Sequence, residues 1–356
     1  DLTERDDTIL YFMGLGRSYV MAPSAIDAGT LGKEPVGSGP YTLDSTTSVA
    51  GSEYHFTKVA DYWDAATYPF QTLAIFPILD ATARHNAMLS GQINVNYGDV
   101  TNLDQAKQQG WNIAERVSGW VGLQFTDHTG AKVEALGKTE VRQALNYAFD
   151  GAAILQAVGS GAGVVTNQVF PDGGATNDAS LNDMYAFNVA KAKELLADAG
   201  YPNGFTVMMP IAPIFAQWQP SAEQALTDIG VTVTWDQMQQ PDYQLNAASY
   251  PMFIAFLAMD GNSVATVARQ VTSKQWFNPA PDYASFPEVA SIVDEINTTT
   301  GDEQASAIAD LNTKLTELAW WSVWYQANNT YYSVPGITVQ PVIGMMFPTL
   351  RYIQHG

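Results

Sequence analysis

The sequence predicts an α/β protein with two lobes, and three observations support this prediction. Helical and extended segments alternate along the chain and are separated by glycines, as in folds that pack helices on sheets. The 356 residues are many for one hydrophobic core and sufficient for two. The stretch Ser118–Asp150 places an aromatic extended segment directly before a helix, so we interpret it as the crossing from one lobe into the other.

The crossing stretch itself combines two periodicities. Residues 119–125 alternate in the manner of a strand, and a polar loop then leads into a helix over residues 140–150. The apolar residues of this helix recur three and four positions apart and form one stripe, which consists of Val141, Ala144, Leu145 and Ala148.

The first third of the chain repeats this alternation on a smaller scale. Asp80 is expected to cap a helix over residues 81–90, and Gly91 to end it. A second short helix is expected to end at Gly110. Short apolar or alternating runs predict the strands, which are Leu73–Leu79, Ile93–Tyr97 and Trp111–Val117.

The rest of the chain follows the same criteria. Asn188 is expected to cap a helix that ends at Gly200, and Pro220 stands where a first helical turn would start. The longest apolar run, Tyr250–Met259, is too short to span a bilayer and suits a buried strand. The remaining elements are strands at Phe205–Met209, Val231–Trp235, Trp320–Tyr325 and Thr330–Val334, and helices at Val289–Ile296 and Ile308–Leu318.

Charge and residue content exclude several classes of protein. The chain has 16 Lys and Arg against 36 Asp and Glu, a formal net charge of −20, so its surface repels phosphate backbones and we expect no nucleic-acid partner. It contains no cysteine, which excludes disulfides and thiolate metal sites. The chain opens at Asp1 without the basic and apolar regions of a signal peptide, which leaves a cytoplasmic chain and a processed or truncated one as alternatives.

Most motifs that indicate catalysis are missing from the sequence. It has neither a P-loop nor a G-x-S-x-G element, and none of its histidines are spaced to share a metal. Gly159–Gly163 is rich in glycine but lacks the preceding strand of a dinucleotide-binding loop, so we interpret it as a turn. We expect no enzyme, cofactor or metal site, although a carboxylate pair for glycoside hydrolysis stays open because such pairs can be distant in the chain.

Five segments, taken in order, carry a family resemblance. Pro35–Tyr41 is similar to a P-V-G-T-G-P-Y element, with Ser38 in place of threonine. Val141–Asp150 is close to V-R-Q-A-L-N-Y-A-I-D, and Ala190–Pro202 to A-x-K-A-K-x-L-L-x-E-A-G-Y-P. The two other segments are Tyr62-Trp63 and Ala87–Asn94. Together they resemble the extracellular solute-binding proteins of family 5, the oligopeptide, dipeptide and nickel class of ABC importer receptors.

The resemblance implies a periplasmic-binding-protein-like fold of type II (cluster C), with two lobes, a two-strand hinge and a central ligand cleft. The hinge strands would lie near residues 118–126 and 322–333. Lobe I would comprise residues 1–124, lobe II residues 125–327, and residues 328–356 would return to lobe I.

The position of one motif implies a shortened lobe I. In the family the P-V-G-T-G-P-Y element comes well into the chain, whereas here it begins at Pro35. We therefore expect a large N-terminal portion to be absent, with a naturally minimal protein as the alternative.

The residues after the long apolar run are the first ligand candidates. Asp260 matches by position the aspartate with which the family's peptide binders hold an α-ammonium group, through a charge-assisted hydrogen bond. Those members usually have a tryptophan shortly before it, where this chain has Leu257 and Met259, so peptide specificity stays open. Asn262 and Arg269 follow; Arg269 can pair with a ligand carboxylate or form a surface salt bridge.

Three tryptophans are the second group of ligand candidates, namely Trp120, Trp218 and Trp276. Their rings offer a large apolar face and a polar N–H, which suits stacking on sugars or peptide planes. The alternative for each is a place in the core, since aromatic residues mostly serve packing.

These observations predict a receptor that captures a peptide or similar extended solute by hinge closure and passes it to the membrane permease subunits of an ABC importer. We expect a monomer outside the cytoplasmic membrane, in the periplasm or held by a lipid anchor at the outer face. An oligosaccharide receptor of the same fold and a two-lobed α/β hydrolase are the alternatives.

Overall fold

The structure, a computed structural model, describes residues 5–17, 20–345, 347 and 349–356, so that Asp1 lies outside the described residues. The chain divides into two compact units, Asp1–Arg116 with Asn329–Gly356, and Val117–Asn328. The lobe boundaries and the hinge given above stay predictions. Among the described residues, no helix combines the length and the apolar character needed to cross a bilayer.

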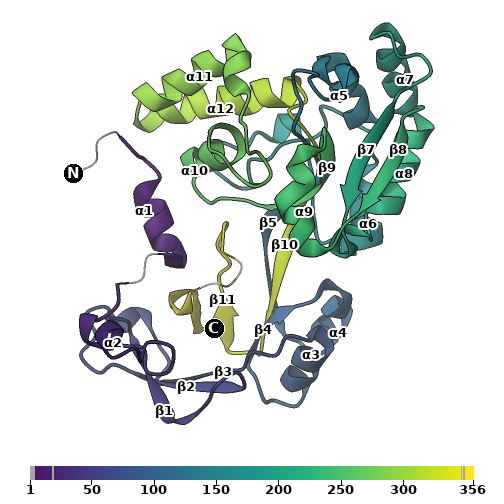
Figure 1. Ribbon diagram of the computed structural model, residues 1–356. Coiled ribbons are helices and arrows are strands. Elements are labelled where there is room, and N and C mark those ends of the chain that lie inside the picture. The colour runs from purple at the N-terminus through teal and green to yellow at the C-terminus, as the bar shows by residue number, and fades with distance from the viewer. Residues whose placement is uncertain (1–4, 18–19, 346, 348) are drawn as a thin grey trace. The chain divides into compact units, whose positions relative to one another are not determined.

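The first unit contains a three-stranded antiparallel sheet in the order β1-β2-β3, visible at its labelled strands in Figure 1. Its elements before residue 80 are helices α1 (Ile9–Phe12) and α2 (Pro23–Asp27) and strands β1 (Tyr41–Val49), β2 (Glu53–Lys58) and β3 (Thr72–Ile75). The strand expected from Leu73 to Leu79 is therefore shorter than predicted and ends before a turn that leads into the next helix.

The remainder of the first unit packs two helices around a small core of Met88, Ala106 and Tyr332. The Asp80 side chain accepts a hydrogen bond from the Ala83 amide at 2.7 Å, which confirms the predicted cap. The elements are α3 (Ala81–Leu89), β4 (Val95–Gly98), α4 (Leu103–Gln108), β11 (Ile337–Val339) and β12 (Ile353–His355).

The second unit contains most of a sheet in the order β4-β10-β5-β9, with β6 paired to β10, whereas β4 belongs to the first unit. Its long strands are β5 (Asn112–Phe125) and β10 (Trp321–Ser333), which are neighbours in the sheet and both continue into the first unit. Strand β9 (Met252–Ala258) pairs antiparallel with β5 and forms one edge, and β6 (Gly163–Val165) is short.

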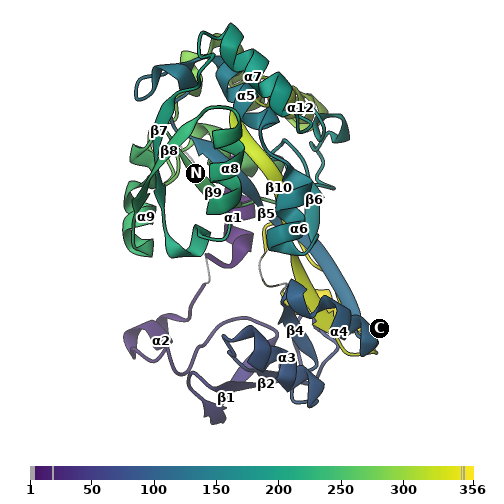
Figure 2. The same cartoon turned by 90° about the vertical axis from the view of Figure 1, so that its right-hand side faces the viewer.

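Helices surround this sheet within the second unit. Figure 1 shows β7 and β8 side by side as a separate parallel pair next to α8, and Figure 2 shows α5 beside α7. The remaining elements of this unit are α5 (Thr139–Tyr147), α6 (Gly151–Gly159), α7 (Val189–Asp198), β7 (Thr206–Ile211), α8 (Gln219–Asp228), β8 (Thr232–Gln237), α9 (Gln240–Asn246), α10 (Ser263–Val267), α11 (Pro287–Thr298) and α12 (Gly301–Glu317).

Two predicted pairs of short strands are each one long strand. The extended runs 111–117 and 119–125 join in β5, and the aromatic runs near residues 320–334 join in β10. The glycines inside β5 are not breaks but points of close approach. A Cβ atom added at Gly122 would lie 2.0 Å from the main-chain oxygen of Ser322 on β10, so only glycine lets the two strands pair there.

The helix predicted over residues 140–150 ends earlier than predicted, and a further helix begins just after it. Helix α5 ends at Tyr147, and the Asp150 side chain starts α6 by accepting from the Ala153 amide at 2.9 Å. Asn188 caps α7 in the same way, through the Lys191 amide at 2.9 Å, as predicted. Gly159–Gly163 forms the turn between α6 and β6.

Candidate ligand-binding site

The end of β9 combines exposure and charge at the edge of a sheet. The strand is buried from Met252 to Ala255, but Phe256 is 45% exposed although it lies inside the strand. The Met259 amide still donates to the Ser118 carbonyl at 3.0 Å, so the pairing with β5 continues to the residue before Asp260. Asp260 therefore begins the loop after the last paired residue, which confirms its predicted position at a strand end.

The ring of Phe256 lies across Gly119 of the neighbouring strand. A Cβ atom at Gly119 would lie 2.4 Å from this ring, so the glycine makes room for it. The Trp218 ring supports Phe256 from the side, with 6.3 Å between the ring centroids and 62° between the planes. An exposed aromatic ring held in place by a second ring is suited to contact an apolar part of a ligand.

Trp218 itself lies mostly inside the protein. It precedes α8, and its Nε1–H donates to the hydroxyl of Tyr325 on β10 at 2.8 Å. Burial raises the pKa of the Tyr325 hydroxyl above its usual value. Because the indole N–H is already used, Trp218 supports Phe256 through its ring.

Asp260 and Arg269 form an ion pair in the loop after β9. The Arg269 Nε lies 2.8 Å from Asp260 Oδ2, and the exposed fractions of the two side chains are 17% for Arg269 and 1% for Asp260. Asn262 caps α10 by accepting from the Ala265 amide at 2.9 Å, and one π-helical turn, Ala268–Thr272, follows. This short cap, helix and π turn bring Arg269 back onto the carboxylate.

The other two tryptophans lie apart from Phe256. Trp120 faces Leu257 in the β5–β9 pairing and is fully buried, with its ring centroid 6.4 Å from that of Trp321. Trp276 is 39% exposed and contacts Phe253, with 5.9 Å between centroids. Side chains of a strand alternate between faces, so both tryptophans lie on the face opposite Phe256.

The predicted residues are thus brought together only in part. Asp260, Asn262 and Arg269 share the segment after β9, and Trp218 adjoins that strand beside Phe256, whereas Trp120 and Trp276 lie on its opposite face. Their roles in ligand binding stay predictions. Phe256 was missed because it is one apolar residue in an apolar run. The signal for it is Gly119 on the neighbouring strand, which leaves room for the ring and can be recognised only when the strand register is known.

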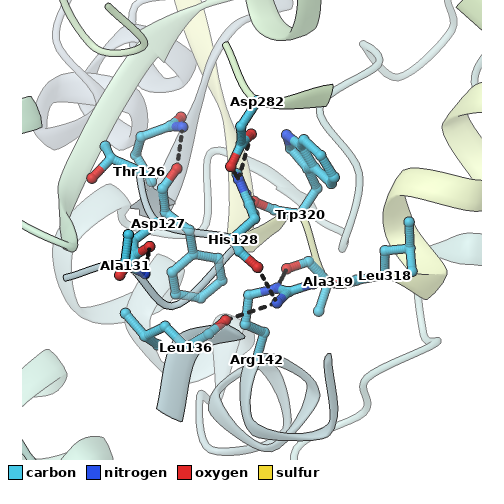
Figure 3. A network of polar contacts seen from close by, with 12 residues as sticks. Thr126, Asp127, His128, Ala131, Leu136, Arg142, Asp282, Leu318, Ala319 and Trp320 are labelled. Carbon is cyan, nitrogen blue, oxygen red and sulfur yellow. Dashed lines mark hydrogen bonds and ion pairs between the residues drawn. The ribbon is translucent and has the colours of Figure 1, made fainter. Parts of the chain in front are cut away.

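A separate polar network, shown in Figure 3, explains the V-R-Q-A-L-N-Y segment. The side chain of Arg142 is fully buried and donates to the main-chain oxygens of Leu136 at 2.8 Å, Leu318 at 2.9 Å and Ala319 at 3.2 Å. Burial lowers the pKa of this guanidinium to about 10. Arg142 therefore satisfies carbonyls at the end of α12, and the segment is structural.

His128 and Asp282 form the second part of this network (Figure 3). The His128 Nδ1 lies 3.0 Å from Asp282 Oδ1, its Nε2 lies 2.9 Å from the Trp320 carbonyl oxygen, and its ring stacks on Trp320 at 4.0 Å. Each ring nitrogen of His128 therefore lies within hydrogen-bonding distance of an acceptor oxygen. With both nitrogens engaged, the pair resembles a catalytic dyad in composition but has no nitrogen left to take a proton from a substrate.

A small recess of about 220 Å³ lies elsewhere in the second unit, between α5, α7 and the end of α12. Its lining consists of Gln143, Tyr147, Met184, Tyr185, Lys191, Leu195 and Glu317. It is below the usual size of a small-molecule site and contains no residue of β9 or its following loop. Among the described residues, no group of three His, Asp or Glu side chains is placed to hold a metal ion.

Solved structures of periplasmic binding proteins share this fold. HbpA2 from Haemophilus parasuis matches with a TM-score of 0.77 at 20% identity, over 94% of this chain and 68% of that one. This confirms the predicted type II fold. Sequence comparison then gives the family: the model for bacterial extracellular solute-binding proteins, family 5 (middle region), matches residues 2–279, and the chain belongs to this family.

Two relatives extend the comparison. The heme-binding protein A of Haemophilus influenzae is 29% identical over 287 residues, 74% of this chain and 50% of that protein. The dipeptide-binding protein of Escherichia coli is 29% identical over 218 residues, 59% of this chain and 38% of that protein. The match spans half or less of the length of these relatives. The family resemblance inferred from the five motifs is confirmed, and the extracytoplasmic location agrees with the family.

Proposed function

We propose that this chain is the solute-binding part of an ABC importer receptor that captures a peptide or similar extended solute and leaves it chemically unchanged. The observation that carries the proposal is the end of β9, where an exposed aromatic ring is followed by a fixed pair of charges. Family membership supports it, and the dipeptide-binding relative supports the choice of ligand class.

The main chain of β9 favours a peptide over a sugar. In an antiparallel ladder, alternate residues direct their N–H and C=O groups away from the partner strand. The Met259 amide bonds to Ser118, so in the register with β5 it is Phe256 and Ile254 whose main-chain N–H and C=O groups point away from β5. The Ile254 oxygen accepts a hydrogen bond from the Tyr243 hydroxyl at 2.6 Å. An extended peptide can pair with such an edge while its side chain rests on the Phe256 ring.

The partners follow from the same proposal. Membrane permease subunits would receive the solute, and the receptor would act as a monomer that closes about the β5 and β10 crossings. The engaged state of both His128 nitrogens supports binding without catalysis.

The experiment is a titration of the purified chain with pools of short peptides and, separately, of oligosaccharides, followed by tryptophan fluorescence and calorimetry. We expect saturable binding of one peptide per chain, with the peptide recovered intact by mass spectrometry. Phe256→Ala should weaken it about tenfold, since removing an aromatic contact costs on the order of 1.4 kcal/mol or more. Ile214→Ala, at another exposed apolar residue, is the control. Binding of sugars alone, or release of cleaved products, would overturn the proposal.

A further inference from the structure

The carboxylate of Asp260 is out of reach of a ligand. Only 1% of its side chain is exposed, and its Oδ2 already lies 2.8 Å from the Arg269 Nε. A ligand ammonium would have to displace the guanidinium and enter a space that is closed to solvent. Since a buried carboxylate that loses its partner is strongly destabilised, this exchange is unfavourable.

Arg269 is the member of the pair that faces outward, with 17% of its side chain exposed. A guanidinium has five N–H donors in a rigid, planar fork, and the Nε atom is the part of it that lies 2.8 Å from Asp260 Oδ2. The edge formed by the two Nη groups matches the two oxygens of a carboxylate and can hold them with parallel hydrogen bonds. The ion pair with the buried aspartate holds the guanidinium in this loop before a ligand arrives.

The distance along the strand fits a short solute. Phe256 and Asp260 are four residues apart, which in extended chain corresponds to about 13 Å. One molecule can therefore place an apolar group on the Phe256 ring and an anionic group at the loop that holds Arg269. In a chain with a net charge of −20, a cation held in the loop that follows an exposed aromatic ring is a distinctive recognition feature.

We infer that Arg269, positioned by Asp260, receives an anionic group of the solute, so that this receptor selects a carboxylate and not an ammonium. The inference rests on the proposed function and deepens it. Asp260 is a positioning residue, and Arg269 is the residue that touches the ligand.

The test uses one pool of tripeptides in three forms: with free ends, N-acetylated and C-amidated. A fourth pool contains N-acylated amino acids and a fifth contains amino-acid amides, so that acids and amines are compared outside the peptide class. Acetylation should leave the affinity nearly unchanged, whereas amidation should weaken binding about tenfold or more, because it removes the charge-assisted pair.

Variants test whether the preference for a free carboxylate depends on Arg269. Arg269→Gln should reduce binding of the free and acetylated pools to the level of the amidated pool, and Lys274→Gln, which removes an exposed cation five positions later, should not. Asp260→Asn should retain the preference for acids with a smaller loss. The double variant Asp260→Asn/Arg269→Gln leaves no buried charge unpaired, so its loss of binding cannot be attributed to misfolding if its melting curve is normal.

The outcomes distinguish the inference about Arg269 from the proposal that the chain is a peptide receptor. Binding that needs a free amine, or that Asp260→Asn abolishes while Arg269→Gln spares, would overturn the inference and leave a peptide receptor standing. Binding of the N-acylated amino acids without any peptide would retain the inference and remove the peptide proposal. Failure of all five pools to bind would remove both.

Discussion

Replacing Arg142 by methionine should destabilise the second unit markedly, although the two side chains have similar length. The guanidinium donates to the oxygens of Leu136 at 2.8 Å and Leu318 at 2.9 Å, and to that of Ala319 at 3.2 Å. Hydrogen bonds from a charged group contribute about 1.5–3 kcal/mol each, so the two short ones amount to about 3–6 kcal/mol. Methionine avoids the cost of burying a charge, which offsets part of this loss, and we expect a net decrease of about 3 kcal/mol in the free energy of unfolding.

Urea unfolding, followed by tryptophan fluorescence and far-UV circular dichroism, measures this difference. Glu140→Gln is the matched control, because Glu140 is exposed on the same helix and its replacement should change the unfolding free energy by less than about 0.5 kcal/mol. Arg142→Lys should not restore stability, since a single ammonium cannot reach carbonyls on both sides of the fork. If Arg142→Met is indistinguishable from Glu140→Gln, the network in Figure 3 does not hold the end of α12.

Three further changes test other parts of the structure. Gly122→Ala should lower the free energy of unfolding by about 3 kcal/mol or more, because the added Cβ would lie 2.0 Å from the main-chain oxygen of Ser322. A normal melting temperature would contradict the β5–β10 register. Burial acts to raise the pKa of Asp282, but the hydrogen bond and charge of His128 outweigh it and hold that pKa below its usual value. The stability that this carboxylate contributes is therefore complete above its unfolded pKa of about 4, and it is lost as pH falls through the lower folded pKa. Asp282→Asn should consequently flatten the acid side of a curve of unfolding free energy against pH. An unchanged acid side would argue against the His128–Asp282 pair. His85 is buried with no partner for either ring nitrogen among the described residues, so His85→Leu should raise the unfolding free energy by about 1 kcal/mol, and a clear loss in thermal melting would reveal a partner.

Local rules were sufficient for much of the fold. Asp80 and Asn188 were recognised as caps from residue type and position alone, because a cap depends on a side chain and an amide only three residues away. The same rules could not reveal the close approaches at Gly119 and Gly122. A glycine looks the same in sequence whether it breaks a strand or lets a neighbour approach, and the difference depends on Phe256 and Ser322, which are far away in the chain.

In the candidate site, too, the sequence predicted the local feature but not the one that depends on packing. Asp260 was correctly placed after a strand, but its state depends on Arg269, which reaches it only through a capped helix and a π turn. From the sequence, Asp260 was interpreted as a carboxylate available to a ligand ammonium. Arg269 was interpreted as a partner of a ligand carboxylate or as part of a surface salt bridge. Neither interpretation describes the observed arrangement, in which the buried Asp260 positions the more exposed Arg269. Burial depends on how the loop packs, and the residue types alone do not reveal it.

The V-R-Q-A-L-N-Y segment shows why the frame and the ligand contacts can change independently. Arg142, Gln143 and Asn146 donate to the oxygens of Leu318 at 2.9 Å, Glu317 at 2.8 Å and Trp321 at 3.0 Å, so α5 is tied to the point where α12 ends and β10 begins. Strand β10 neighbours β5, and β5 sets the register of β9. The position of the end of β9 is therefore fixed by main-chain contacts that do not depend on which side chains occupy it. Substitutions at the exposed Phe256 should consequently alter what is bound without altering stability, whereas substitutions in α5 should do the reverse.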